Sequence, residues 1–565
     1  MTITSRPELT AEQRENYVQS ESEATVTGGG RIVAILRDKD LIQHEREQQI
    51  AQYVFADLIR RGEFLCETTD EGFSPRCYYR SQTGGLFDLC NAPKMKELMR
   101  AYGLLSPKQL TDIVANHVLA SAIKNGRKVN IHTGVRFDPI EVEIRVALST
   151  TDTLVIRINY AEIVENGTDG VLMLPSGQPF SPDLAAIMDC KLGLKVAPGS
   201  LMHDTFAANY ADEPLTQAEH LQVVCAYILQ LFFQQPHSNK PLLVLDAESG
   251  AGKTTLATKI GSTIQGARFE VNDLPDRKDD LEALLTSKTL VVLDNLDKPA
   301  LVRKYESLIC QTCSGGAIAK RVLHTTLDPM QFPLTASLIC TSIDLSWMVS
   351  TIARRSLMVS LSPRFLDGRE EDDSSISAKV LTVRDALMSE IMGRCRNILI
   401  AMRAQAEYKP SRILQLHDFA GFILRAAVHE GWHDGAVTLI RKIDSAQKGE
   451  AAANNPILIA IELYIGKDIE HTQRIPASIL AKRLNVAAEV GGIDLKPIAG
   501  AYGMRGIINQ QFSSLAKAYG LHKEIDPHTK TNVYWFEPSV EVRGRCAKHL
   551  SLACKWVAVE EGTFV

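Results

Sequence analysis

The sequence predicts an α/β fold, in which a central parallel β-sheet carries a phosphate-binding loop (P-loop), an α+β domain precedes it and helical regions follow. Three observations lead to this fold class. The chain has 565 residues, too many for a single core. Short β-branched runs alternate with helical stretches from about residue 240 to 365. Within that region an apolar run, a glycine-bearing turn and a helix follow one another directly.

Composition indicates a chain of folded domains, with 45% apolar and 23% charged residues. The 62 basic and 67 acidic residues leave a net charge of −5, so any contact with a polyanion has to be local. The 11 cysteines, with Cys310-x-x-Cys313 as the single CxxC pair, are expected to be reduced thiols. The polar N-terminus lacks an apolar signal core, and the longest apolar stretch, Val223 to Phe233, is shorter than a membrane span. We expect a cytoplasmic protein with no membrane role.

Composition shifts and turn-rich seams divide the chain into successive parts. Residues 1–28 are expected to be a flexible leader, and 29–205 an α+β domain with alternating strand-like runs. Residues 206–366 are the expected P-loop domain. Residues 367–449 are an acidic linker followed by a helical lid, and 450–565 form a C-terminal domain.

The N-terminal α+β domain carries one weak candidate site. His132, Arg136 and Asp138 lie close together in the sequence and have side chains capable of binding or acid–base chemistry. A solvated strand edge is the favoured explanation for these residues.

The segment PLLVLDAESGAGKTTLATKIG has the order that a phosphate-binding loop requires. Gly250 and Gly252 allow backbone conformations that turn successive amides inward, toward the positive end of the helix that follows. Lys253 is expected to reach the β and γ phosphates of ATP, and Thr254 to offer its hydroxyl to Mg²⁺. Ala247 stands where this motif more often has glycine, which is tolerated if its backbone is not left-handed. The expected nucleotide contacts are Ala247, Glu248, Ser249, Gly250, Ala251, Gly252, Lys253, Thr254 and Thr255.

A second strand, in KTLVVLDNLD, ends at Asp294. A carboxylate at a strand tip opposite the loop can hold Mg²⁺, so Thr254 and Asp294 are the expected metal-binding pair. Asn295 follows, and an amide cannot accept a proton as a general base. Hydrolysis is then expected to use Asp297 or another carboxylate, to use Asn295 only to orient water, or to be slow. The structural alternatives are a glycine turn that binds nothing and a strand-ending turn aspartate.

After Asp294 the chain reads LICQTCSGGAIAKRVLHTT, then TASLICTSID, then STIARRSLMVSLSP. This order resembles that of superfamily-three helicases and related phage and plasmid helicase-like ATPases of the AAA+ class. The resemblance covers roughly residues 240–365 and a helical region around KPSRILQLHDFAGFILR. It implies ATP hydrolysis by a homo-oligomeric ring, a hexamer, that acts on nucleic acid.

The resemblance also implies roles for particular residues. A glycine-containing hairpin with basic residues, which projects into the channel of such rings, is matched by Gly315, Gly316, Lys320, Arg321 and His324. A polar sensor on the γ-phosphate side is matched by Thr341 and Ser342, and an arginine pair that serves the neighbouring subunit by Arg354 and Arg355. Arg412 takes the place of a lid arginine. The structural alternatives are a solvated hairpin face, a strand end, surface ion pairs and a helix cap.

The C-terminal region predicts three helices followed by a polar hairpin, an arrangement that resembles a winged helix. Its third helix would present side chains to DNA bases and phosphates, and its hairpin would form the wing. The expected DNA-facing residues are Arg505, Asn509, Gln510, Gln511, Ser513 and Lys517 on the helix, with His528, Lys530 and Thr531 on the wing. Winged helices also serve as protein-docking or structural modules, so that alternative stays open.

The sequence therefore predicts an ATP-driven, DNA-binding motor that takes part in replication of a phage, plasmid or other mobile element. Single-stranded or forked DNA is the expected partner. One alternative is a regulatory switch or loader that binds DNA without unwinding it, which Asn295 favours. Another is an interaction scaffold that binds ATP with little turnover.

Overall fold

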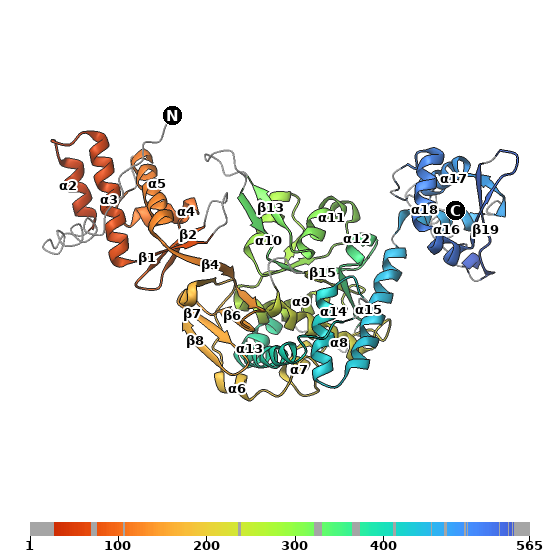
Figure 1. The fold of residues 1–565 in the computed structure, drawn as a ribbon, viewed down its shortest axis with the longest axis horizontal. Helices are drawn as coiled ribbons and strands as arrows, with labels where there is room; N and C mark the ends of the chain where they lie inside the picture. Colours follow the sequence, from red (N-terminus) through yellow and green to blue (C-terminus); the bar gives the residue numbers. More distant parts are fainter. Residues whose placement is uncertain are drawn as a thin grey trace.

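The computed structural model describes residues 28–68, 76–104, 108–234, 239–320, 330–363, 373–410, 414–453, 455–467, 472–490, 493, 495, 497–529, 531–540, 542–544 and 546. The central sheet and its helices lie between an N-terminal part and a C-terminal part (Figure 1). All cysteines within these ranges are free thiols. None of the helices described is both long and apolar enough to cross a membrane.

The N-terminal part is a mixed sheet covered by helices. Its strand order is β3-β2-β1-β4-β9; β2 is antiparallel to both β1 and β3, whereas β4 runs parallel to both β1 and β9. Buried side chains between residues 32 and 122 form its core. The strands are β1 Gly62–Glu67, β2 Cys77–Ser81, β3 Leu86–Asp88, β4 Arg127–Thr133 and β9 Val171–Leu174, and the helices are α2 Gly28–Arg37, α3 Gln43–Arg61, α4 Ala92–Arg100 and α5 Lys108–Asn125.

An antiparallel sheet follows, in the order β5-β6-β7-β8, and packs against the central body. Alternate residues of its strands, Ile144 and Val146 of β6 and Leu154 and Ile156 of β7, enter the shared core, so one face of the sheet packs there. Its elements are β5 Val135–Asp138, β6 Glu143–Ala147, β7 Asp152–Ile156 and β8 Ala161–Glu165, followed by η1 Thr168–Gly170, α6 Leu184–Asp189 and α7 Leu201–Phe206.

The central sheet is parallel throughout, with strand order β11-β12-β15-β10-β16. This confirms the predicted α/β class. Runs such as LLVLD and LVVLD form its strands because a parallel sheet is buried on both faces. The strands are β10 Leu242–Asp246, β11 Asn272–Asp273, β12 Leu290–Asp294, β15 Ser337–Ser342 and β16 Ser356–Ser360. The helices around it are α8 Gln217–Gln230, η2 Leu231–Phe233, α9 Lys253–Gln265, η3 Gly266–Arg268, α10 Lys278–Ser287, α11 Pro299–Cys313 and α12 Ser350–Ala353.

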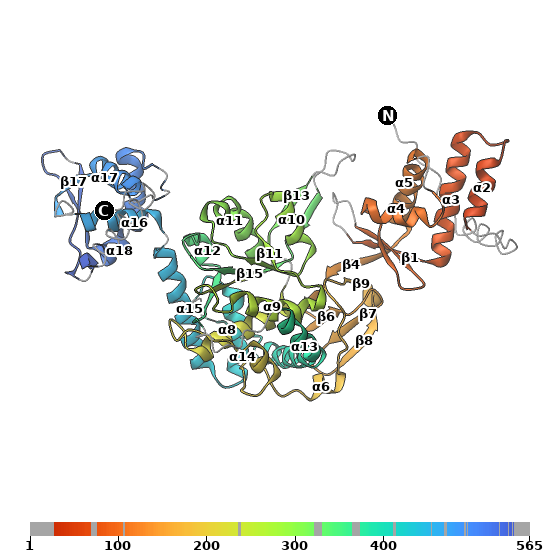
Figure 2. The ribbon, with the colours of Figure 1, turned by 180° about the vertical axis from the view of Figure 1, so that it is seen from behind.

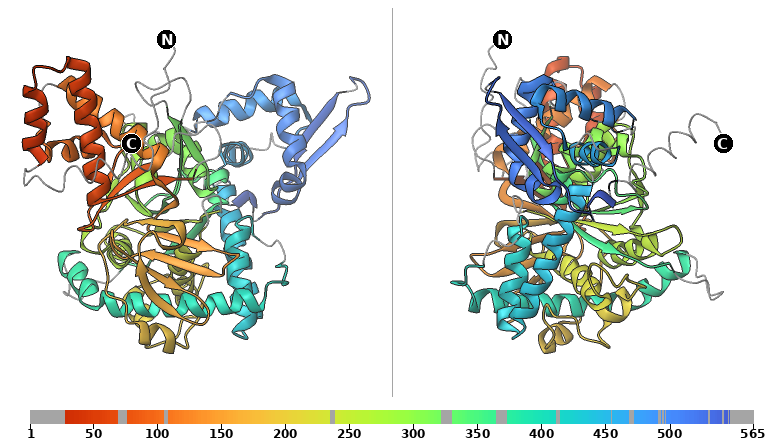
Figure 3. Two further views of the ribbon diagram at one scale, coloured as in Figure 1. Left: turned by 60° about the vertical axis from the view of Figure 1, so that its left-hand side comes forward. Right: turned by 90° about the vertical axis from the view of Figure 1, so that its right-hand side faces the viewer.

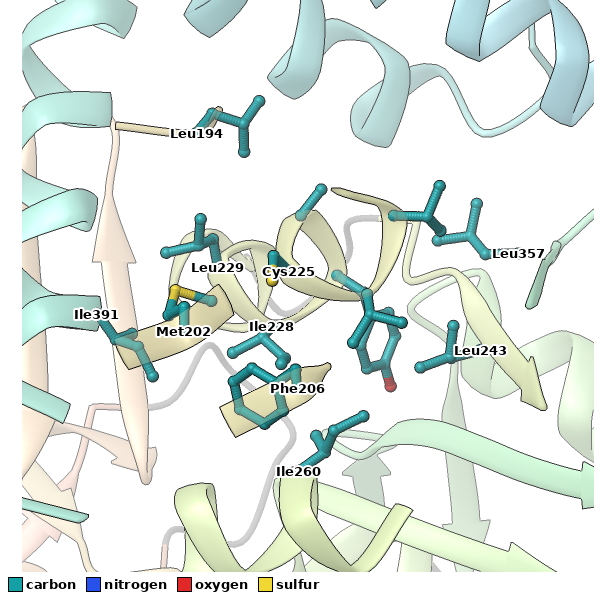
Figure 4. Packing of buried hydrophobic residues seen from close by; sticks show 14 of the residues in the cluster. Leu194, Met202, Phe206, Cys225, Ile228, Leu229, Leu243, Ile260, Leu357 and Ile391 are labelled. Carbon is teal, nitrogen blue, oxygen red and sulfur yellow. The ribbon is translucent and has the colours of Figure 1, made fainter. Parts of the chain in front are cut away.

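Alternate residues of the central strands enter two cores. Leu243 and Leu245 face a large cluster that draws residues from 144 to 443, whereas Leu242 and Val244 face a second cluster on the other side. In Figure 4, Met202 and Phe206 pack with Ile228 of α8 and Ile260 of α9. The expected boundaries near residues 205 and 366 therefore fall within a region whose two sides share one core.

Three long helices close the large cluster and lead to the C-terminal part. They are α13 Asp373–Ala404, α14 His417–His429 and α15 His433–Ala453. The arrangement from behind is visible in Figure 2, where α13 and α14 lie beneath the sheet and α15 runs toward the C-terminal part.

The C-terminal part has a core of its own, formed by residues between 461 and 546. Figure 3 shows its helices and hairpin beside the central body, joined to it through α15. Helices α17 and α18 pack against a three-stranded sheet of order β17-β19-β18. The elements are α16 Pro456–Lys467, β17 Ile475–Pro476, α17 Ala477–Val490, α18 Gly500–Tyr519, β18 Leu521–Ile525 and β19 Asn532–Phe536.

Candidate active site

The glycine turn lies between β10 and α9, at the carboxyl edge of the central sheet. Gly250 and Gly252 have φ angles of 78° and 90°, the left-handed region that favours glycine. Ala247 is not left-handed, as the substitution of alanine for glycine there requires. Among the residues that the structure describes, the backbone amides of Gly250, Gly252, Lys253 and Thr254 have no protein acceptor. Those free amides at a helix N-terminus form a cradle suited to an anion.

Lys253 lies across this turn. Its Nζ donates hydrogen bonds to the carbonyl oxygens of Ala247 at 2.6 Å and Glu248 at 2.9 Å. Burial lowers the pKa of Lys253, while the nearby carboxylates of Asp297, Asp246 and Asp294 oppose that shift. The Lys253 ammonium group therefore has three carboxylates nearby and two carbonyl oxygens as hydrogen-bond partners. An incoming polyanion would replace the two carbonyl oxygens.

Asp294 ends β12 at the same edge of the sheet. Thr254 Oγ1 donates to Asp294 Oδ1 at 3.0 Å, although 40 residues separate the two in sequence. Thr341 Oγ1 donates to the same Oδ1 atom, and Asn295 Nδ2 donates to Oδ2 at 3.1 Å. The structure thus places Thr254, Asp294 and Thr341 in one hydrogen-bonded group.

The strand order explains why Thr341 joins this group. β15 lies between β10 and β12, so its last residues, Thr341 and Ser342, emerge between the glycine turn and Asp294. Both residues are fully buried. Thr341 contacts Asp294, whereas Ser342 contacts Asp297 Oδ1; the sensor role expected for the two residues stays a prediction.

Asn295 and Asp297 have different surroundings. Asn295 has a φ of 53°, a left-handed conformation that asparagine tolerates better than most residues. Its backbone amide donates to Thr341 Oγ1 at 2.9 Å. Asp297 Oδ1 accepts from Ser342 Oγ at 3.1 Å and from the Ile343 amide at 2.8 Å. The side chain of Asp297 is therefore fixed by β15 and the residue that follows it, whereas the Asn295 side chain contacts Asp294.

The arginine pair lies at the opposite edge of the sheet. Arg354 and Arg355 precede β16, and the Leu242 amide at the start of β10 donates to Arg355 O at 2.8 Å. Arg355 Nη1 donates to Thr351 O at 2.7 Å and Nε to Ser314 Oγ at 3.2 Å, which holds its side chain on its own subunit. The Arg354 side chain is exposed. Neither guanidinium is near the glycine turn of the same chain.

The basic hairpin is described in part. β13 (Ala317–Lys320) pairs with β14 (Met330–Pro333) in antiparallel register, after Gly315 with a φ of 68°. The strands confirm a hairpin at the predicted place. Lys320 is the last residue of β13, but its side chain lies outside the described residues, as do Arg321, His324 and Arg412.

In the C-terminal part Arg505 is exposed on α18, and His528 and Thr531 lie at the turn between β18 and β19. Lys530 and the side chains of Asn509, Gln510, Gln511, Ser513 and Lys517 lie outside the described residues. The sequence did not single out Trp535, whose ring stacks on His522 at 5.1 Å with Arg474 4.7 Å above it. Nothing in the local pattern links Arg474 to β18 and β19.

The N-terminal trio forms no open site. Arg136 Nη2 donates to Asp138 Oδ2 at 2.6 Å on the same strand, β5. Burial lowers the pKa of His132 to about 4, and the nearby Arg136 acts in the same direction. Arg136 and Asp138 lie on β5, an edge strand of its sheet, whereas His132 lies on β4 between β1 and β9 and is partly buried, so the explanation as a solvated strand edge does not describe His132.

Asp246, the last residue of β10, was not anticipated as a site residue. Burial raises its pKa to about 6, and Glu450 on α15 adds to the rise while Lys253 opposes it. Its place at the end of the strand that enters the glycine turn is the one signal that the sequence offered. Asp246 therefore changes protonation near neutral pH, directly before the anion cradle.

Comparison with known proteins gives one family match. Residues 209–434, a region that covers less than half of the chain, match the family model described as actinomycete integrative conjugative element replication protein. A search among curated proteins finds no match.

Two solved structures align over most of the chain with low scores. The SCCmec type IV Cch, described as an active helicase, is 10% identical over 85% of this chain and 94% of its own, with a TM-score of 0.44. The apo NrS-1 C-terminal region is 10% identical over 86% of this chain and 98% of its own, with a TM-score of 0.39. By its family match, the central region of this chain is similar to a replication protein of a mobile element.

Proposed function

We propose that this protein is an ATP-dependent nucleic-acid motor of the AAA+ kind, which works as a ring, a hexamer, in replication of a mobile element. The observation that carries the proposal is the 3.0 Å hydrogen bond between Thr254 of the glycine turn and Asp294 of a different strand. Two residues that are distant in sequence meet only if the loop and the strand tip form one site. The family match of residues 209–434 supports the replication role.

The residues at the turn fit ATP and Mg²⁺. The free amides of Gly250 and Gly252 would bind phosphate oxygens, and Lys253 would exchange its two carbonyl partners for the β and γ phosphates. Thr254 and Asp294 would hold Mg²⁺, which supplies neutralisation of phosphate charge. Thr341 and Asn295 each donate to Asp294 and so keep its carboxylate facing Thr254.

Asp297 is the carboxylate best placed to activate water. It lies near Lys253 and is fixed by Ser342 and the Ile343 amide through a single oxygen, Oδ1. Asn295 cannot accept a proton, and its amide is turned onto Asp294. We assign proton acceptance to Asp297 and orientation of Asp294 to Asn295.

The position of the arginines supports the proposal of a ring of subunits. Arg354 lies at the amino edge of the sheet and the glycine turn at the carboxyl edge, with the length of β10 between them. An exposed arginine on that edge would reach the phosphates of a neighbouring subunit, where it stabilises charge on the transferring phosphoryl group. A head-to-tail interface of this kind forms a ring when the rotation from one subunit to the next closes, which is what we propose here.

Contact with DNA is assigned to two surfaces. One is the hairpin of β13 and β14, at whose end Lys320 and Arg321 stand in the sequence and would contact a nucleic-acid backbone in the channel of the ring. The C-terminal part, which we assign as a winged helix, offers Arg505 on α18 and the stacked pair His522 and Trp535 on its strands. Repetition of one small hairpin around the ring would allow a chain of net charge −5 to hold a single strand.

The proposal is tested by ATP hydrolysis with and without single-stranded DNA, together with strand displacement on a forked duplex. The Lys253→Ala variant is expected to lose hydrolysis, and the wild type to unwind the fork only with ATP. Asn295, whose amide cannot accept a proton as a general base, favours a second candidate, a DNA-binding switch or loader. That candidate would bind DNA in an ATP-dependent manner and displace no strand. Tight ATP binding without turnover at any DNA concentration would instead indicate a scaffold.

A further inference from the structure

A cavity of about 600 Å³ lies at the side of the central body where the chain enters β10, away from the glycine turn. The Asn239 amide, just before β10, donates to Asp418 Oδ2 in its lining at 2.9 Å. Its other walls come from β5, from α8 and η2, from the end of α13 and from α14. These elements are distant in sequence, so the cavity is a product of the tertiary fold.

One wall of the cavity is aromatic. The Phe137 and Phe233 rings are 5.3 Å apart and tilted by 60°, and the Phe233 and Phe422 rings are 5.2 Å apart and tilted by 51°. All three phenylalanines line the cavity. A planar apolar ring can pack against such a wall, edge to face or offset.

The cavity is also lined by polar groups, and two of their atoms have no hydrogen-bond partner within the described residues. Gln230 is 4% exposed and lines the cavity, and its Oε1 atom has no hydrogen-bond partner within the described part of the chain. Arg425 Nε, also buried, lacks a partner in the same sense. Arg403 and His417 line the cavity with exposed side chains. Buried polar atoms are costly when unpaired, so this arrangement indicates that a ligand supplies the missing bonds.

The backbone at the rim is strained in a way that supports a binding role. Val142, which lines the cavity, has a φ of 52°, and a β-branched residue rarely adopts this left-handed conformation. Such residues persist where the surrounding structure imposes them, often beside a ligand site.

We propose that this cavity binds a planar heteroaromatic ring that carries an anionic group, the chemistry of a mononucleotide. The ring would lie against Phe233 and Phe422, and its polar edge would bond to the Gln230 amide. Arg425, with Arg403, would bind the anionic group. The inference does not rest on the proposed function, because the cavity shares no residue with the glycine turn.

Equilibrium dialysis of the full chain against radiolabelled ADP tests this second site. With the glycine turn disabled by Lys253→Ala, the chain is expected to bind one ADP in a saturable manner. Adding Arg425→Gln or Gln230→Leu should weaken that binding, the arginine change by about 10- to 100-fold, since a bond to a charged group is lost. Arg441→Gln, on the exposed face of α15, makes the same charge change elsewhere and should leave binding unchanged. Unlabelled ADP should compete better than adenosine or pyrophosphate.

The two sites fail in distinguishable ways. The second site is refuted if the Lys253→Ala chain binds no ADP. It is also refuted if adding Arg425→Gln or Gln230→Leu to that chain leaves its affinity for ADP unchanged. If Lys253→Ala leaves the wild-type stoichiometry unchanged, the glycine turn is refuted instead, whatever the Arg425 result. The single variant Arg425→Gln, in which Lys253 is unchanged, is the folding control. It should still bind ADP at the glycine turn.

Discussion

Arg354 provides the sharpest test of the ring. The glycine turn follows the carboxyl end of β10, and Arg354 lies beside its amino end. β10 has five residues, which at about 3.3 Å each separates the two ends by about 16 Å. An arginine cannot cover that separation within its own chain. Arg354→Ala is therefore expected to leave ATP affinity within about threefold of wild type and to lower kcat by about 10³- to 10⁵-fold.

Mixing two inactive variants shows whether the arginine acts between subunits. Lys253→Ala chains keep Arg354 but lack a working turn, and Arg354→Ala chains have the reverse defect. In a random equal mixture, half of the turns are intact and half of those face an intact arginine, so about a quarter of the sites become active. Steady-state ATP hydrolysis of the mixture measures this recovery.

Arg355→Ala is the matched control. Its guanidinium donates hydrogen bonds to Thr351 O and Ser314 Oγ of its own chain. This change should therefore lower the melting temperature, and it should lower kcat far less than Arg354→Ala does. The reasoning is wrong if mixing restores no hydrolysis, or if Arg354→Ala weakens ATP binding as strongly as Lys253→Ala does.

Three further predictions follow from the site and its surroundings. Thr341→Val removes the hydrogen bond to Asp294 and leaves the Asn295 backbone amide unpaired. The free energy of unfolding, measured by heat or urea, should fall by about 1–3 kcal/mol, and ATP hydrolysis should fall as well. An unchanged free energy of unfolding would contradict this hydrogen-bond network. Because the pKa of Asp246 rises from 3.8 to about 6, the protonated form is stabilised in the fold and that stability is lost as pH rises through about 6. Asp246→Asn should therefore stabilise the chain at pH 7.5, by at most about 3 kcal/mol, and little at pH 4, as urea titrations at both pH values would measure; an equal effect at both would exclude this titration. Lys320→Ala with Arg321→Ala should keep basal hydrolysis and lose its stimulation by DNA, and intact stimulation would refute the hairpin assignment.

Much of the site could be predicted from the sequence because its parts are local. The apolar run, Gly250, Gly252 and the helix that follows occupy consecutive positions, and backbone preferences alone dictate a strand, a left-handed turn and a helix N-terminus. The tolerance of Ala247 could also be stated in advance, as a condition on one backbone angle that the structure meets. The hairpin after Gly315 was expected from the resemblance to superfamily-three helicases, and β13 and β14 pair at that place.

Other features could not be predicted, because they depend on contacts between distant segments. Burial in the tertiary fold raises the pKa of Asp246, and Glu450 on α15 adds to the rise; no pattern around residue 246 contains either fact. Trp535 acquires Arg474 and His522 as neighbours only when β17, β18 and β19 form one sheet. The changes in composition near residues 205 and 366 also gave no sign that the segments on both sides share one hydrophobic core.

By itself, the sequence determined that a helix N-terminus with inward amides would stand beside Lys253, since glycine and apolar periodicity act within a few residues. Only the tertiary structure decided which groups surround it. The strand order inserts β15 between β10 and β12, which brings Thr341 onto Asp294, and it sends Arg354 to the far edge of the sheet. The physical reason is that strand order follows from the packing of whole helices and sheet faces, and short-range backbone preference carries no information about it.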